Sequence, residues 1–117
     1  MYFANIFSLA HDTFEQFIQK AGYTWAGWFK ETKYMIPIRH AECDYLRPFH
    51  AGGVYDVEVA VAEFSTSSFK MQYTFKQNGH DHAIVRMVHT TLDGKTFKKI
   101  DLPEEVRTKL TPYLKAP

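Results

Sequence analysis

Hydrophobic residues in the first 22 positions recur at helical spacing. Counted from Ile6, the apolar or small side chains fall at i, i+3, i+4, i+7, i+8, i+11, i+12 and i+15, which predicts one apolar stripe along a helix. The stripe consists of Ile6, Leu9, Ala10, Thr13, Phe14, Phe17, Ile18 and Ala21. Asn5 is a suitable N-cap and Gly22 a suitable left-handed C-terminal residue. We therefore expect a long amphipathic helix in segment 1–22, which either only fills the core or also presents its N-terminus to a ligand.

Alternation of hydrophobic and polar residues predicts strands in the middle of the chain. We interpret 34–48 as one long strand, in which Pro37 must lie near the start or on a sheet edge. Segment 54–63 directs Tyr55, Val57, Val59 and Val61 to one side. Segment 68–76 directs alternate residues inward, namely Phe69, Met71, Tyr73 and Phe75. The residues between them are expected to face outward, namely Ser68, Lys70, Gln72, Thr74 and Lys76.

Turn signals join these strands and bound the last elements. Segment 48–53 (PFHAGG) is turn-like, and the Asn78-Gly79 pair predicts a hairpin into a strand over 83–92. Asp93 and Gly94 predict a second hairpin, followed by a short last strand over 95–100. From Asp101 the pattern changes to LPEEVRTKLTPYL, which predicts a short C-terminal helix.

The order of elements predicts an α+β fold in one domain. A chain of 117 residues suits a single core. A sheet of four or five antiparallel strands with one apolar face needs a covering element, and the N-terminal helix is the one long candidate. The mixed segment 23–34, with Trp25, Trp28 and Phe29, is interpreted as a loop whose aromatic residues cover a pocket edge or cap the core.

Composition excludes several classes of protein. The net charge of +1 gives no broad attraction to nucleic acid or membrane, so neither is expected as a partner. Cys43 is the single cysteine, which rules out an internal disulfide and fits a reducing cytoplasm. The opening residues lack the basic flank of a secretory signal and are too short a run to span a membrane.

Few motifs carry chemistry by themselves. The chain has no Gly-rich phosphate loop and no Gly-x-Ser-x-Gly elbow, and we expect no cofactor. His80 and His82 fall in a hairpin turn without further ligands in the sequence nearby, so we expect no metal there. The free N–H groups at the start of the first helix, by contrast, can stabilise a developing oxyanion.

Basic side chains occur on the two strands joined by the Asn-Gly turn and again just after them. The first group is Lys70, Lys76 and Arg86, and the second is Lys95, Lys98 and Lys99. Together they form either a small basic surface for a phosphorylated ligand or a solvated sheet face.

Several segments, spread nearly from end to end, are similar to one family. They are Tyr2 to Asn5 running into HDTFEQFIQKAG, then PIRHAECDYLRPFHAGG, VYDVEVAVAEF, SSFKMQYTF and LPEEVRTKL. The chain resembles the hotdog-fold 4-hydroxybenzoyl-CoA thioesterases, and His11 followed by an acidic residue is similar to the 1,4-dihydroxy-2-naphthoyl-CoA thioesterases among them. The resemblance implies a helix wrapped by a curved antiparallel sheet, a homodimer or homotetramer, and acyl-CoA bound between subunits with its phosphates on basic side chains.

The family motif before the helix is only partly present. Its pattern is Asp-x-x-Gly-(Ile/Val)-(Val/Met)-(Tyr/Phe)-(Tyr/Phe/His), and Met1 falls on the hydrophobic residue before Tyr2, so the catalytic Asp, the Gly and the first strand have no counterpart. The resemblance implies that the backbone N–H of Phe3 polarises the thioester carbonyl. We expect a chain start that is truncated or misassigned. The alternatives are that Asp12 or Glu15 replaces the missing acid, although both lie off the apolar stripe, or that the protein binds without catalysis.

The expected activity is hydrolysis of an acyl-CoA, with an aromatic acyl group permitted, to a carboxylic acid and free CoA. We assign the catalytic roles to the Phe3 N–H and to His11, which borders the apolar stripe and is otherwise a structural histidine. Substrate binding is assigned to Tyr2, Asn5, Ser68, Lys70 and Arg86. The alternative is a ligand-binding protein with a cystatin-like cone, which would function as a monomer, whereas a hotdog site needs a second subunit.

Overall fold

The computed structural model describes residues 5–22, 34–49 and 54–115. Tyr2 and Phe3 lie outside the described residues. So do the expected loop over 23–33 and the glycine turn at 50–53.

The first helix, α1, spans Asn5–Lys20. Its buried residues belong to the predicted stripe, namely Ile6, Ala10, Phe14, Phe17 and Ile18. Gly22 has φ +102° just beyond the last turn, as predicted for a left-handed terminator. Asn5 is already the first helical residue, so its prediction as the N-cap is wrong by one position.

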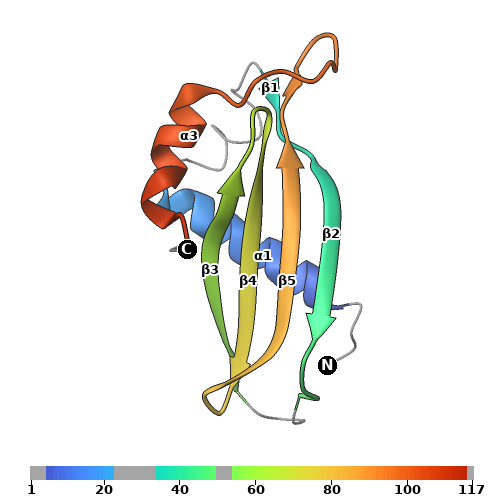
Figure 1. Cartoon of the computed structure of the whole chain (residues 1–117), viewed down its shortest axis with the longest axis vertical. Coiled ribbons are helices and arrows are strands. Elements are labelled where there is room, and N and C mark those ends of the chain that lie inside the picture. Colours follow the sequence, from blue (N-terminus) through green and yellow to red (C-terminus); the bar gives the residue numbers. More distant parts are fainter. Residues whose placement is uncertain (1–4, 23–33, 50–53, 116–117) are drawn as a thin grey trace.

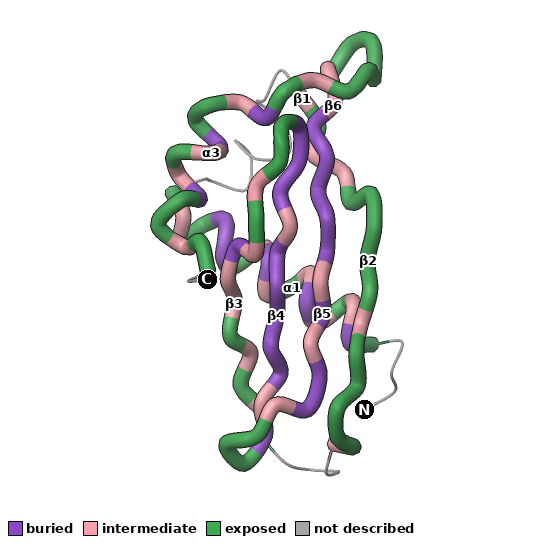
Figure 2. Tube along the Cα trace, viewed as in Figure 1, coloured by how far each residue is buried: buried purple, intermediate pink, exposed green. Residues whose placement is uncertain are grey.

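One four-stranded antiparallel sheet carries the fold, and α1 crosses behind it (Figure 1). Its strands are β2 (Ile38–Tyr45), β3 (Asp56–Phe64), β4 (Ser68–Gln77) and β5 (His80–Thr90), in the order β2-β5-β4-β3. The central strands β4 and β5 are the most buried, and β2 and β3 form the edges (Figure 2). The hairpin predicted at Asn78-Gly79 is confirmed, with both residues at positive φ.

The structure corrects two strand predictions. The expected long strand 34–48 is broken at Pro37. Tyr34–Met35 forms a short strand, β1, that pairs with β6 (Leu92–Asp93) in a separate two-stranded sheet. Proline ends the pairing because it has no N–H, although its carbonyl still accepts the Thr90 N–H at 3.0 Å. The predicted last strand over 95–100 is wrong as well, since that segment is a turn with one isolated bridge at Lys99.

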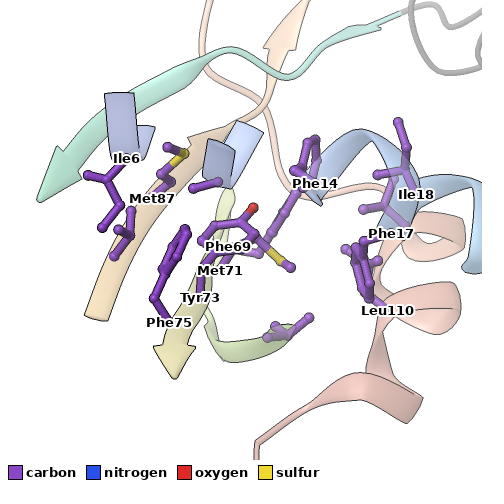
Figure 3. Packing of buried hydrophobic residues seen from close by; sticks show 14 of the residues in the cluster. Ile6, Phe14, Phe17, Ile18, Phe69, Met71, Tyr73, Phe75, Met87 and Leu110 are labelled. Atoms are coloured by element: carbon purple, nitrogen blue, oxygen red, sulfur yellow. The ribbon is translucent and has the colours of Figure 1, made fainter. Parts of the chain in front are cut away.

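The core lies between the sheet and the helices (Figure 3). The C-terminal helix α3 (Glu104–Leu110) continues into a 3-10 turn, η1 (Thr111–Tyr113), and contributes Val106 and Leu110 to the core. The inward residues of β4 predicted from alternation are all at most 1% exposed. No helix among the described segments is long and apolar enough to cross a membrane.

Candidate functional site

A groove of about 350 Å³ lies between the first half of α1 and the edge strand β2. The helix contributes Phe7, Ser8, His11 and Asp12, and the sheet contributes Ile38, Ala41 and Met87. The groove therefore combines an apolar floor with a histidine and a carboxylate, the mixture of groups that small-ligand sites commonly present.

His11 is held in this groove by the next turn of the helix. Its Nδ1 lies 3.4 Å from Glu15 Oε1, and the two side chains are 39% and 29% exposed. The spacing i, i+4 places both on one side of α1. A carboxylate at one ring nitrogen orients the imidazole, so the other ring nitrogen can exchange a proton with a bound reactant.

Among the described residues, a possible set of metal ligands lies on this same stretch of α1. Ligand atoms of His11, Asp12 and Glu15 all lie within 4.8 Å of one another. All three come from one helix face, and Asp12 is exposed to solvent. Since exposed acidic groups approach each other in this way without an ion, we assign the cluster no metal role.

His89 lies beneath α1 and was missed by sequence reasoning. It is 2% exposed, and its ring stacks between Phe14 at 4.4 Å and Phe69 at 5.0 Å. Burial lowers the pKa of His89 to about 4, His11 nearby acts in the same direction, and the Ile36 backbone opposes both. Neither ring nitrogen makes a hydrogen bond of normal geometry with the described residues. The one feature that could have pointed to His89 is its inward position on its strand, opposite Phe69.

Ser68, Lys70 and Arg86 lie on the outer face of the sheet, opposite α1. They alternate with the inward residues of β4 and β5, so one chain does not bring them together with His11. Lys70 is 3.0 Å from Glu63, and Arg86 is 3.3 Å from Asp44. Ser68 Oγ lies 2.6 Å from Ser65 Oγ beside a shallow hollow of about 290 Å³.

The remaining candidate residues lie in surroundings that suit a structural role rather than a catalytic one. His82 is buried, with its Nδ1 2.9 Å from the Pro48 carbonyl. His40 contacts Glu42 rather than Asp44. Burial, followed by the charge of Asp44, raises the pKa of the Cys43 thiol, which disfavours a thiolate nucleophile. Asn5 is exposed at the start of α1.

Comparison with known proteins identifies the family. A family model described as the thioesterase-like superfamily matches residues 1–110. The chain belongs to the thioesterase-like superfamily. A 1,4-dihydroxy-2-naphthoyl-CoA hydrolase of Synechococcus elongatus is 28% identical to it over 108 residues, which cover 92% of this chain and 79% of the relative.

Solved structures support the same thioesterase-like fold. A 1,4-dihydroxy-2-naphthoyl-CoA thioesterase from Synechocystis superposes with a TM-score of 0.83 at 20% identity, covering 95% of this chain and 82% of the other. A Staphylococcus aureus protein in complex with CoA superposes with a TM-score of 0.85 at 16% identity, covering 100% and 76%. The predicted hotdog fold is confirmed, and membership of this superfamily supersedes the cystatin-like alternative.

Proposed function

We propose that this protein is an acyl-CoA thioesterase, which cleaves a thioester to a carboxylic acid and free CoA. The observation that carries the proposal is the groove between α1 and β2 with His11 and Glu15 at its side, in a chain of the thioesterase-like superfamily. The lone cysteine fits a cytoplasmic location, which is part of the same proposal.

The acyl group is proposed to be aromatic. The Synechococcus relative is named for an aromatic CoA ester. Phe7, Ile38 and Met87 give the groove apolar and polarisable surfaces against which a ring can pack. A flat aromatic acid therefore suits the groove better than a charged or strongly hydrated one.

In the proposed reaction, His11 acts as the general base. It takes a proton from water as the water oxygen attacks the thioester carbon, and Glu15 stabilises the imidazolium that results. The Phe3 N–H is assigned to polarise the carbonyl oxygen, and Tyr2 and Asn5 are assigned to substrate binding. The tetrahedral intermediate then collapses, the C–S bond breaks, and His11 returns the proton to the departing sulfur.

The proposed assembly is a homodimer, or a tetramer built from it. β2 is an open edge strand, and apolar side chains are exposed at its ends, with Ile38 at 41%, Tyr45 at 43% and Leu46 at 53%. Open edges of this kind favour pairing with another strand. A strict monomer on sizing in solution would contradict this part of the proposal.

The direct test is thiol release from a panel of aromatic and aliphatic acyl-CoAs. We expect turnover that favours aromatic esters, and a loss of about 10²- to 10⁴-fold in kcat for His11→Gln. Glu15→Gln should lose less, because it orients the base rather than moving the proton. Gln19→Ala, on the exposed back of α1, serves as the matched control and should retain full activity. Absence of thiol release with every ester would refute the proposal.

A further inference from the structure

His89 connects the two walls of the groove between α1 and β2. Its ring stacks on Phe14 of α1, and its partner across the strand pair is Ile38 of β2, which lines the groove. The described residues that line the groove do not include His89 itself. We propose that His89 is a positioning residue, whose ring sets the distance between α1 and the start of β2 and thereby the width of acyl group that the groove accepts. The inference rests on the proposed thioesterase function and concerns a residue that the substrate does not touch.

On the helix side, four aromatic rings form a column. The His89 ring lies nearly parallel to that of Phe69 on β4, with an interplanar angle of 9° and centroids 5.0 Å apart. It lies at 23° to the Phe14 ring, with centroids 4.4 Å apart. The Phe14 ring in turn lies 6.3 Å from that of His11. Stacked rings have a fixed thickness and hold their neighbours apart. The column therefore determines how far α1, with His11 on it, stands from the sheet.

On the sheet side, the start of β2 is irregular. Pro37 supplies no N–H, and the pairing of β2 with β5 shifts register between Ile38 and His40. A shift of this kind interrupts the ladder and bends the strand. His89 lies directly opposite Ile38, on the same face of the sheet. Burial lowers the pKa of His89 to about 4, and the Ile36 backbone is close enough to the ring to oppose this shift. Contact with a buried ring thus supplements an interrupted ladder.

Core stability alone does not account for a histidine at this position. Both ring nitrogens of His89 are buried without a hydrogen bond of normal geometry to the described residues, which costs stability that an apolar side chain would keep. The low pKa leaves the ring uncharged at neutral pH, so it stacks between phenyl rings without burying a charge. A polar group retained at such a cost, next to a candidate site, indicates a role in the geometry of that site.

Shortening the column should narrow the groove. A smaller side chain at position 89 leaves a cavity beneath α1, and the surrounding residues move partly into it. Because α1 forms one wall of the groove, its movement toward the sheet brings Phe7 and His11 closer to Ile38. An acyl group with two fused rings is then excluded before an acyl group with one ring. The width of the acyl group therefore distinguishes a spacer from a residue that only fills the core.

The test compares kcat/KM for benzoyl-CoA and naphthoyl-CoA. His89→Val should lower the ratio of the naphthoyl to the benzoyl ester about tenfold, because a change of a few carbons in an apolar pocket alters selectivity by this order. His89→Phe restores a flat ring and should keep the ratio within about twofold of that of the unaltered chain. NMR titration with benzoic acid and naphthoic acid should show the same change in preference without any hydrolysis.

Leu110→Ala is the matched control. Leu110 is fully buried on α3, at the other end of the core from Met87 (Figure 3). This variant should lose stability while the selectivity ratio stays unchanged. Should His89→Val fail to fold, His89→Leu retains more of the volume and should shift the ratio in the same direction by a smaller factor.

The outcomes separate this inference from the proposed function. A folded His89→Val or His89→Leu variant with an unchanged ratio, or with a stronger preference for the naphthoyl ester, would show that His89 is not the spacer. An equal shift in Leu110→Ala would show the same. If no ester releases thiol, yet binding of the free acids shows the expected change in preference, the proposed function fails and the role of His89 stands.

Discussion

Different interactions stabilise the two faces of the main sheet. The inner face is apolar and closed by α1, and even its polar members, Tyr73 and His89, lack hydrogen bonds of normal geometry with the described residues. The outer face is charged, and its lysines and arginine lie against carboxylates on neighbouring strands. Burial therefore stabilises one face, whereas the other is covered by exposed ion pairs that contribute little each.

Truncation of an inner aromatic residue should have the largest effect. Phe14 is 1% exposed and packs against His89 and the core, so Phe14→Ala should destabilise the protein by about 3–5 kcal/mol. Denaturant unfolding measures the loss. Glu63→Ala on the outer face is the control, with an expected change within about 1 kcal/mol. Equal losses at the two positions would remove the contrast between the faces.

His89 makes the inner face sensitive to acid. Its pKa is about 4 in the folded protein against an ordinary value of 6.5, so the unfolded state binds the proton more readily. Stability is therefore fully present above pH 6.5 and is lost as pH falls toward 4, by about 3 kcal/mol. Unfolding across this range for the unaltered chain and for His89→Phe should differ in slope. A similar slope in both would show that other groups cause the acid sensitivity.

Breaking one outer ion pair should have a small effect. Glu63→Gln removes the partner of Lys70, whose side chain is 30% exposed, and should cost less than about 1 kcal/mol. The difference should shrink further in about 1 M salt, because screening weakens exposed pairs. A loss above about 2 kcal/mol that persists in salt would mean that the outer face is not stabilised as we describe.

Phe97→Gly should stabilise the protein, unlike the variants above. Phe97 has φ +58°, and glycine adopts positive φ without strain, so this variant should be more stable by up to about 1 kcal/mol. Phe97→Leu keeps the strain and should not gain. A higher Tm is the expected result for Phe97→Gly, and a destabilised variant would show that the ring supports the fold.

Local patterns predicted the faces of the molecule well. Alternation correctly placed Phe69 and Phe75 inward, and the helical spacing correctly placed Phe14. The Asn-Gly pair fixed the β4–β5 hairpin. Pro37 signalled an edge, but not that the chain changes sheets there, because the β1–β6 pairing depends on contacts distant in sequence.

The site was less predictable, because it depends on which side chains lie against one another. His11 was found from its place beside the stripe, and Glu15 was considered only as a replacement acid and not as its partner. The pairing of Lys70 with Glu63 follows from the register of β3 against β4, which no local pattern encodes. The strained backbone of Phe97 could not be predicted from the sequence either, because Asp93 and Gly94 indicate only a turn.

Hydrolysis of an aromatic acyl-CoA in ¹⁸O-labelled water tests the proposed chemistry most directly. Because His11 activates water for direct attack on the carbonyl carbon, a single turnover should give a carboxylic acid carrying one ¹⁸O atom, together with free CoA. The His11→Gln variant should form this labelled acid far more slowly. Acid without label in the first turnover, with ¹⁸O appearing in a protein carboxylate instead, would contradict direct water attack, and no acid at all would contradict the thioesterase assignment.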